Sequence, residues 1–455
     1  MQQISRLQSK QRRRAAFVAM LLLLAGLGGS VIWRGGGAGS ALRASAQLFG
    51  LRPTGEAQLV SVEPLPGTGE EMCPWVPASS EAPLAAFLEQ EKAAARAGSP
   101  ADADSSIMLE RPPVRSIRDS FPTYSAVAVD SKNKEIVLQD ENLFQIMVYD
   151  RMANTPAKAT MTEPKRVISG PEPKMEFNCD LYVDPKSGDI YSINNDTLDS
   201  MVVFSRNAKG NVKPDRILHT PHGTYGIAVD EEAQEVFLTV QHENSVVVYR
   251  KGAEGEEKPL RALEGAHVRL ADPHGIAIDT KNKLMFVANQ GSWKMRKSPG
   301  SGKFVPPSIN VYPLDAKGDT APLRVIEGPN TQLNWPAHLY MDEKRGELYV
   351  ANDAGDGILV FREPDNGDVA PTRVLKGPKT QIKNPTGVFV DMENNELVVA
   401  NMGNHRATVY PRTATGDTPP LRAIRSGPEG VPALQIGNPG AVAFDTKREQ
   451  IIVPN

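Results

Sequence analysis

Short apolar segments that end in aspartate recur along most of the chain. They read SAVAVD, CDLYVD, YGIAVD, HGIAID, AHLYMD, TGVFVD and GAVAFD, and their final residues are Asp130, Asp184, Asp230, Asp279, Asp342, Asp391 and Asp445. A short polar turn follows each aspartate, and a second apolar segment such as LMFVAN, ELYVAN or QIIVPN follows the turn. Two apolar runs joined by so tight a polar turn predict a β-hairpin.

A third and a fourth apolar segment follow the hairpin in six of the copies. The third carries a valine and an aromatic residue near its end, as in SVVVYR and GILVFR, and the fourth has an arginine at a fixed place, as in PLRALE. These arginines are Arg166, Arg216, Arg261, Arg324, Arg373 and Arg422. Four short strands in each unit of about 45–60 residues, repeated along a chain, predict a β-propeller.

The number of blades is inferred from the two ends of the repeat region. The seventh copy, GAVAFD with QIIVPN, contains only two strands, while SSIMLE and PPVRSIRD precede the first copy and match the two missing ones. We therefore expect an all-β, seven-bladed propeller over residues 106–455, with one blade shared between N-terminal and C-terminal strands. Such a blade closes the ring by strand pairing and leaves no open inner edge.

The repeated frame P-x-G-[IV]-x-[VI]-D, followed by LYVAN and by a strand ending in V-[YF], resembles the NHL-repeat propellers. It is also similar to the YVTN-type propellers of bacterial surface and periplasmic proteins. The resemblance covers roughly three quarters of the chain and implies the propeller fold. It leaves the function open, because this fold hosts binding modules, lactonases, lyases and scaffolds.

The N-terminal region predicts a membrane anchor. Residues 15–33 contain no charge and are long enough for a transmembrane helix, and the basic residues 1–14 before them favour a cytoplasmic N-terminus. We expect a single-pass protein of a bacterial-type cytoplasmic membrane, with the propeller on the periplasmic, extracytoplasmic side. A cleaved signal peptide, with Ala44-Ser45-Ala46 as the cleavage site, is the alternative. Residues 34–105 have the composition of a flexible linker with one short helix.

Charge and cysteine content narrow the choice of partners only slightly. The net charge of −3 and the pI of about 6.2 give no support for nucleic-acid binding. The two cysteines, Cys73 and Cys179, fit either one disulfide or two separate thiols.

Polar residues that recur in every copy are expected to be structural. Each strand-ending aspartate accepts backbone N–H groups in an Asx-type turn. The asparagines that end the second strands bond the backbone of the following loop. The arginines of the fourth strands pair with acids or carbonyls of neighbouring blades.

A ligand site is better sought where the copies differ. All seven histidines map to or beside the loops that join a fourth strand to the next first strand, or a second strand to a third. By resemblance to propeller enzymes, these loops form the face that binds ligands over the central channel. The predicted ligand or partner face contains His222, His242, His405, Trp293, Trp335, Asn289 and Asn352.

Three residues near the predicted axis are candidate metal ligands. Four positions before the strand-ending aspartate, most copies have Gly or Ala, but two have Asp180 and His338, and His274 is adjacent in the frame. Imidazole and carboxylate groups bind zinc and other divalent transition metals, so a divalent metal is the candidate cofactor. The same groups suit general base chemistry near neutral pH, whereas ordinary polar loop chemistry is the competing explanation.

Two functions fit these observations. The first is a membrane-tethered module that binds or scaffolds a protein or an envelope polymer on the loop face. The alternative is a metal-dependent, lactonase-like hydrolase or a lyase with its site over the central channel. The chain contains no HExxH, GxSxG or P-loop motif that would favour catalysis.

Overall fold

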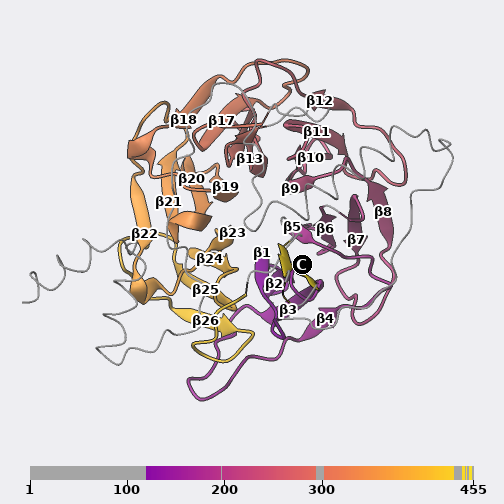
Figure 1. Cartoon of the computed structure of the whole chain (residues 1–455), viewed down its shortest axis with the longest axis vertical. Coiled ribbons are helices and arrows are strands. Elements are labelled where there is room, and N and C mark those ends of the chain that lie inside the picture. Colours follow the sequence, from indigo (N-terminus) through magenta and orange to yellow (C-terminus); the bar gives the residue numbers. More distant parts are fainter. Residues whose placement is uncertain are drawn as a thin grey trace, which may run out of the picture. The chain divides into compact units, whose positions relative to one another are not determined.

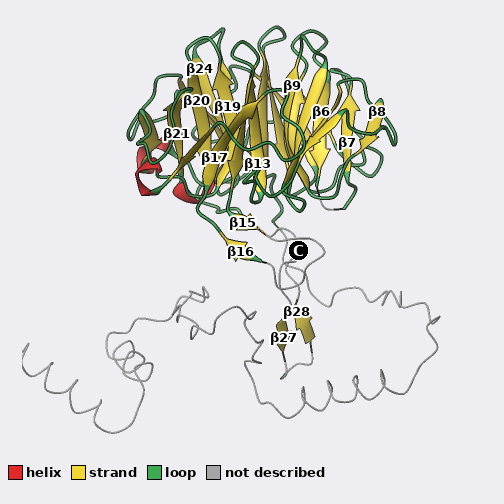
Figure 2. Ribbon diagram, turned by 90° about the horizontal axis from the view of Figure 1, so that it is seen from above, coloured by secondary structure: helices red, strands yellow, loops and turns green. Residues whose placement is uncertain are grey.

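The computed structural model describes residues 119–195, 197–293, 302–434, 443–445, 447 and 450–452. Most of these residues form six four-stranded antiparallel sheets arranged around a central axis (Figure 1). Each sheet is one blade and is built from strands that are consecutive in the chain, apart from a short hairpin inserted in the fourth. Seen from the side, all the blades run between two loop-bearing faces (Figure 2).

The first three blades occupy the N-terminal half of the ring. Blade 1 contains β1 (Tyr124–Asp130), β2 (Glu135–Asp140), β3 (Gln145–Asp150) and β4 (Arg166–Ile168). Blade 2 contains β5 (Asn178–Val183), β6 (Ile190–Asn194), β7 (Ser200–Phe204) and β8 (Arg216–His219). Blade 3 contains β9 (Thr224–Asp230), β10 (Glu235–Val240), β11 (Ser245–Arg250) and β12 (Arg261–Leu263).

The other three blades complete the ring. Blade 4 contains β13 (Pro273–Asp279), β14 (Leu284–Asn289), β17 (Ser308–Pro313) and β18 (Arg324–Glu327), and its inserted hairpin is β15 (Ser292–Trp293) with β16 (Lys303–Phe304). Blade 5 contains β19 (Pro336–Asp342), β20 (Glu347–Asn352), β21 (Gly357–Arg362) and β22 (Arg373–Lys376). Blade 6 contains β23 (Pro385–Asp391), β24 (Glu396–Asn401), β25 (Arg406–Pro411) and β26 (Arg422–Arg425).

A buried apolar cluster fills each junction between neighbouring blades. One cluster combines Phe237 of blade 3 with Met285 of blade 4, and another combines Leu138 of blade 1 with Val398 of blade 6. Alternating side chains of each strand therefore pack against the blade on either side, as expected for sheets that are buried on both faces. The ring is held together mainly by this burial of apolar surface.

The prediction of seven blades is wrong. The first strand of blade 6 lies directly beside the first strand of blade 1, and Thr386 Oγ1 donates to the carbonyl of Tyr124 at 3.3 Å. The buried cluster between these two blades leaves no place for another sheet. The seventh hairpin does form, because β27 (Ala443–Asp445) pairs with β28 (Gln450–Ile452), but it is a separate two-stranded sheet. The segments proposed as its outer strands, SSIMLE (105–110) and PPVRSIRD (112–119), lie outside the described part of the chain except for Asp119.

The predicted membrane topology also needs correction. Within the described residues, no helix is long and apolar enough to span a bilayer. The helical segments found there are three 3₁₀ turns, η1 (Pro329–Thr331), η2 (Asp353–Gly355) and η3 (Pro378–Thr380). Residues 15–33, on which the predicted anchor rested, are not among the residues described.

The repeated aspartates have the predicted structural role. Asp230 Oδ1 accepts the backbone N–H groups of Glu232 and Ala233 at 2.9 Å, and Asp391 Oδ1 accepts those of Glu393 and Asn394. These bonds close the hairpin turn between the first and second strands. The turn at the end of the strand therefore depends on the carboxylate.

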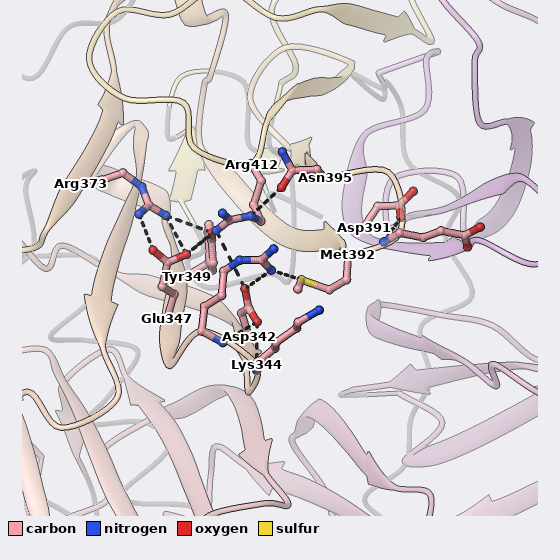
Figure 3. A network of polar contacts seen from close by, with 11 residues as sticks. Asp342, Lys344, Glu347, Tyr349, Arg373, Asp391, Met392, Asn395 and Arg412 are labelled. Carbon is pink, nitrogen blue, oxygen red and sulfur yellow. Dashed lines mark hydrogen bonds and ion pairs between the residues drawn. The ribbon is translucent and has the colours of Figure 1, made fainter.

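The arginines of the fourth strands depart in part from expectation. Four of them bond groups of the next blade, as predicted; these are Arg216, Arg261, Arg324 and Arg422. Four also make bidentate pairs with the glutamate that begins the second strand of their own blade; the pairs are Arg166–Glu135, Arg261–Glu235, Arg373–Glu347 and Arg422–Glu396. Bidentate pairs of this kind fix both geometry and charge. Figure 3 shows one of them within a larger network that includes Arg412.

Candidate ligand site at one end of the propeller axis

The first residues after the second strands form a ring at one end of the axis. In every blade the backbone N–H of this residue donates to the carbonyl of the residue just before the first strand, as Glu141 does to Thr123 at 3.3 Å and Asp353 to Trp335 at 3.0 Å. We call this ring the collar. Its six members are Glu141, Asn195, Gln241, Gln290, Asp353 and Met402.

An unusual backbone conformation produces the collar. The residue whose carbonyl receives the bond has a positive φ in five of the six blades; these residues are Phe177, Gly223, Asp272, Trp335 and Asn384. Glycine and asparagine adopt the left-handed region readily, whereas bulky residues rarely do. The chain therefore turns sharply before each first strand, and its carbonyl points at the collar.

Collar amides connect blades 2, 3 and 4. Asn195 Nδ2 donates to Gln241 Oε1 at 2.8 Å, and Gln241 Nε2 lies 2.6 Å from His274 Nε2. His274 Nδ1 lies 3.0 Å from the carbonyl of Asp272, so Nδ1 carries the proton and Nε2 accepts from Gln241. Burial lowers the pKa of His274, which favours this neutral form.

Tyr225 lies below the collar, where residues of several blades converge. Its ring centroid is 4.2 Å from that of His274. Burial raises the pKa of Tyr225 well above its usual value, and the acidic groups Cys179, Glu141 and Asp180 add to the effect. Groups from blades 1, 2 and 3 are therefore close enough to interact at this point.

Asp180 and His338 meet at the next level of the axis. His338 Nε2 is 3.2 Å from Asp180 Oδ1, and their side chains are 11% and 1% exposed. Asp180 also accepts the backbone N–H groups of Leu181 at 2.8 Å and Ile227 at 3.0 Å. His338 Nδ1 is buried and has no hydrogen-bond partner. The pair thus leaves one imidazole nitrogen uncommitted.

The two collar carboxylates are poorly compensated. Burial, followed by the charges of Asp140 and Asp353, raises the pKa of Glu141 to about 7. Burial also raises the pKa of Asp353, against the opposing hydrogen bond from Asn384 Nδ2 at 2.9 Å. Carboxyl groups perturbed in this way are enriched at functional sites.

The predicted metal ligands are only partly brought together. Asp180 and His338 are in contact, but His274 is occupied by Gln241 and Asp272. No group of three or more His, Cys, Asp or Glu side chains that could hold a metal ion occurs in the described parts of the propeller. These three residues remain predicted ligands, and the pair is the part of the prediction that the geometry favours.

Several residues of the predicted ligand face are committed to the fold. The side-chain carbonyls of Asn289 and Asn352 accept backbone N–H groups of the preceding loops at 3.0 and 2.7 Å, and both residues are buried. His405 is 1% exposed and contacts the carbonyl of Pro122 and the carboxylate of Asp119. These buried residues hold the loops of the face in place through hydrogen bonds to the backbone.

Other predicted residues of the face lie closer to the surface. His222 and His242 have ring centroids 4.8 Å apart, and His222 Nδ1 is 3.1 Å from Asp199 Oδ1. Trp335 is 54% exposed. Trp293 belongs to β15, which pairs with β16.

Sequence reasoning missed the collar itself. Glu141, Asp353, Gln241 and Asn195 occupy one position of the repeat, directly after the residue that ends the second strand. Comparing that position between the copies would have found two acids and three amides in six blades. The prediction compared a position of the first strand instead.

Only one of the two cysteines lies within the described residues. Cys179 is buried, and its Sγ lies 3.3 Å from the carbonyl of Phe177. Cys73 is outside the described residues, so the choice between a disulfide and two thiols stays a prediction.

Comparison with known proteins yields a structural likeness. No family model matches the chain, and no curated protein matches it. A solved structure described as "a functionally unknown protein from Desulfotomaculum acetoxidans DSM 771" is similar at 13% identity, with a TM-score of 0.45 over 69% of this chain and 89% of that chain.

Proposed function

We propose that this chain is a binding module whose ligand or partner binds at the collar end of the propeller axis. The proposal rests on one observation: polar side chains from different blades converge there, while the other repeated polar groups are used in turns and ion pairs. Convergent polar groups in an otherwise apolar fold are typical of binding sites. The partner is a small molecule, or a protein or polymer that inserts one group.

A thermal-shift screen tests the location of this site. Sugars, carboxylic acids, alcohols and amines are added to the full chain, to a Gln290→Trp variant that fills the collar, and to a Glu232→Trp variant on the opposite face. Compounds that raise the melting temperature of the wild type and the Glu232→Trp variant, but not of the Gln290→Trp variant, support the proposal. Equal shifts in all three proteins would exclude the collar as the site.

A hydrolase or lyase is the second candidate, and the Asp180–His338 pair favours it. A carboxylate that holds one imidazole nitrogen leaves the other available as a general base, and His338 Nδ1 has no partner. The test is hydrolysis of simple lactones by the full chain, with and without added zinc or calcium. Turnover that disappears in His338→Gln supports catalysis, whereas turnover that persists in that variant rejects this pair as its origin.

A further inference from the structure

The collar contains two acidic side chains that no cationic side chain of the described residues pairs with. Glu141 and Asp353 are its two charged members, and the other members are amides and one thioether. Among the described residues neither carboxylate forms an ion pair; Lys383, whose charge acts on Asp353 from a distance, pairs with Asp356 at 2.8 Å. Buried or recessed carboxylates normally have a cationic partner.

A second observation at the same place points to a missing donor. Asn195 is 3% exposed, and its Oδ1 has no hydrogen-bond partner, although its Nδ2 is held by Gln241. An amide oxygen buried in this way lacks a hydrogen-bond donor. The collar thus contains carboxylate and amide acceptors and no cationic donor of its own.

Trp335 is an exposed aromatic residue whose backbone is hydrogen-bonded to the collar residue Asp353. Its carbonyl accepts the N–H of Asp353, its backbone has φ 53°, and its side chain is 54% exposed. A large aromatic residue in a left-handed conformation, exposed to solvent, stabilises neither the backbone nor the core. An aromatic face beside a carboxylate is a common arrangement for binding organic cations.

We propose that the collar binds a protonated amine or guanidinium group, held by Glu141, Asp353 and the Oδ1 of Asn195, with Trp335 alongside. This inference rests on the function proposed above and specifies its ligand class. An organic cation carries several N–H donors and can reach separate acceptors at once. A single metal ion needs ligands gathered around one point, and the described residues offer no group of three His, Cys, Asp or Glu side chains for it.

Isothermal titration calorimetry of the full chain tests the proposal with two kinds of probe. The small-molecule arm compares cadaverine with the neutral 1,5-pentanediol. The peptide arm compares acetyl-Gly-Lys-Gly-amide with the same peptide containing norleucine. Binding of cadaverine indicates a free amine as ligand, and binding of the lysine peptide alone indicates a side chain of a partner protein.

The variants separate this proposal from the more general one. We expect Glu141→Gln/Asp353→Asn to bind the cationic probe at least ten-fold more weakly, and Glu232→Gln/Glu393→Gln, two exposed acids of the opposite face, to bind it as the wild type does. Equal affinity in both variants, or no binding of either cationic probe, overturns the cation proposal. If acids or alcohols bind instead and are lost in Gln290→Trp, the cation proposal fails while the collar remains the binding site.

Discussion

Asp180 and His338 come from opposite blades, and His338 Nε2 lies 3.2 Å from Asp180 Oδ1 near the axis. Their counterparts in the other blades are Ala126, Gly226, Gly275 and Gly387, so only these two side chains are long enough to reach across. A glycine there permits close approach of neighbouring first strands: a Cβ added to Gly275 would lie 2.6 Å from the Cα of His338. The close spacing of the first strands around the axis thus allows Asp180 of blade 2 to reach His338 of blade 5.

Removal of either partner should destabilise the ring. His338→Ala leaves the Asp180 carboxylate buried without its partner, and we expect a loss of about 3 kcal/mol in the free energy of unfolding. In a double-mutant cycle with Asp180→Ala, the double variant should lose less than the sum of the two single variants, measured by urea denaturation. Strict additivity would show that the two groups are not coupled. His267→Ala, which removes an exposed partner of Asp319, is the control and should have little effect.

Glu141 should make the protein less stable as the pH rises. The pKa of Glu141 is about 7 in the folded chain and lies near 4.5 in the unfolded chain, so the folded state binds the extra proton between these values. Its contribution is present below pH 4.5 and is lost as the pH rises through 7. We expect Glu141→Gln to exceed the wild type by about 2 kcal/mol at pH 8, and to equal it at pH 4, in urea denaturation. A gap that does not change with pH would contradict this assignment.

Glu347 should have the opposite pH dependence. Although desolvation opposes it, hydrogen bonds from Arg373 and Tyr349 lower the pKa of Glu347 to about 2 (Figure 3). A lowered pKa stabilises the fold above pH 4.5, and this contribution disappears as the pH falls through 2. Glu347→Gln should therefore cost about 3 kcal/mol at pH 7 and almost nothing at pH 2, provided that unfolding is two-state. Glu232→Gln, an exposed acid, should follow the wild-type pH profile.

Gly275→Ala should strain the junction between blades 4 and 5. The added Cβ would meet backbone atoms of Ala337 and His338 at 2.6–2.9 Å, and backbone cannot move aside as a side chain can. We expect a loss of about 2–3 kcal/mol in thermal or urea unfolding. Gly252→Ala is the matched control, because its Cβ would meet only the flexible end of Arg250 at 3.7 Å. Similar effects of both changes would mean that the contact at Gly275 is not restrictive.

Trp335→Asn should separate stability from binding. Asparagine tolerates the left-handed backbone, as Asn384 does in blade 6, so the variant should gain about 1 kcal/mol in the free energy of unfolding. The same change removes the exposed indole of the residue that is bonded to Asp353 and should weaken binding of the cationic probe. Leu323→Asn, which replaces another exposed apolar side chain, should leave binding unchanged. A loss of stability in Trp335→Asn would show that the indole supports the fold.

Local features of the repeat were predictable because they depend on neighbouring residues. The hairpin turn at Asp230 and the bond accepted by Asn352 use groups close in the chain. They recur in each copy, so the pattern of residues carries the information. The four-stranded blade follows from the same local signals.

The number of blades could not be obtained by counting copies. It depends on how closely neighbouring first strands approach, and glycines such as Gly226 and Gly387 set that distance. The contact between Asp180 and His338 depends on the number in turn, because a ring of seven blades has no two that face each other across the centre. The sequence therefore allowed the prediction that Asp180 and His338 occupy the same repeat position near the axis, but not that the two side chains are in contact.

Among the described residues, blades 1 and 6 are the neighbouring blades that are not consecutive in the chain, and no described strand crosses the boundary between them. Backbone and side-chain contacts close it, among them the N–H of Thr155 with the carbonyl of Ala423 at 2.8 Å and Arg151 with Glu396 at 2.7 Å. We expect heat or mechanical force to separate blades 1 and 6 before it separates any other pair of neighbouring blades. Glu141 of blade 1 and Met402 of blade 6 are both members of the collar. We therefore expect a ligand bound at the collar to hold these two blades together and to make the ring harder to open.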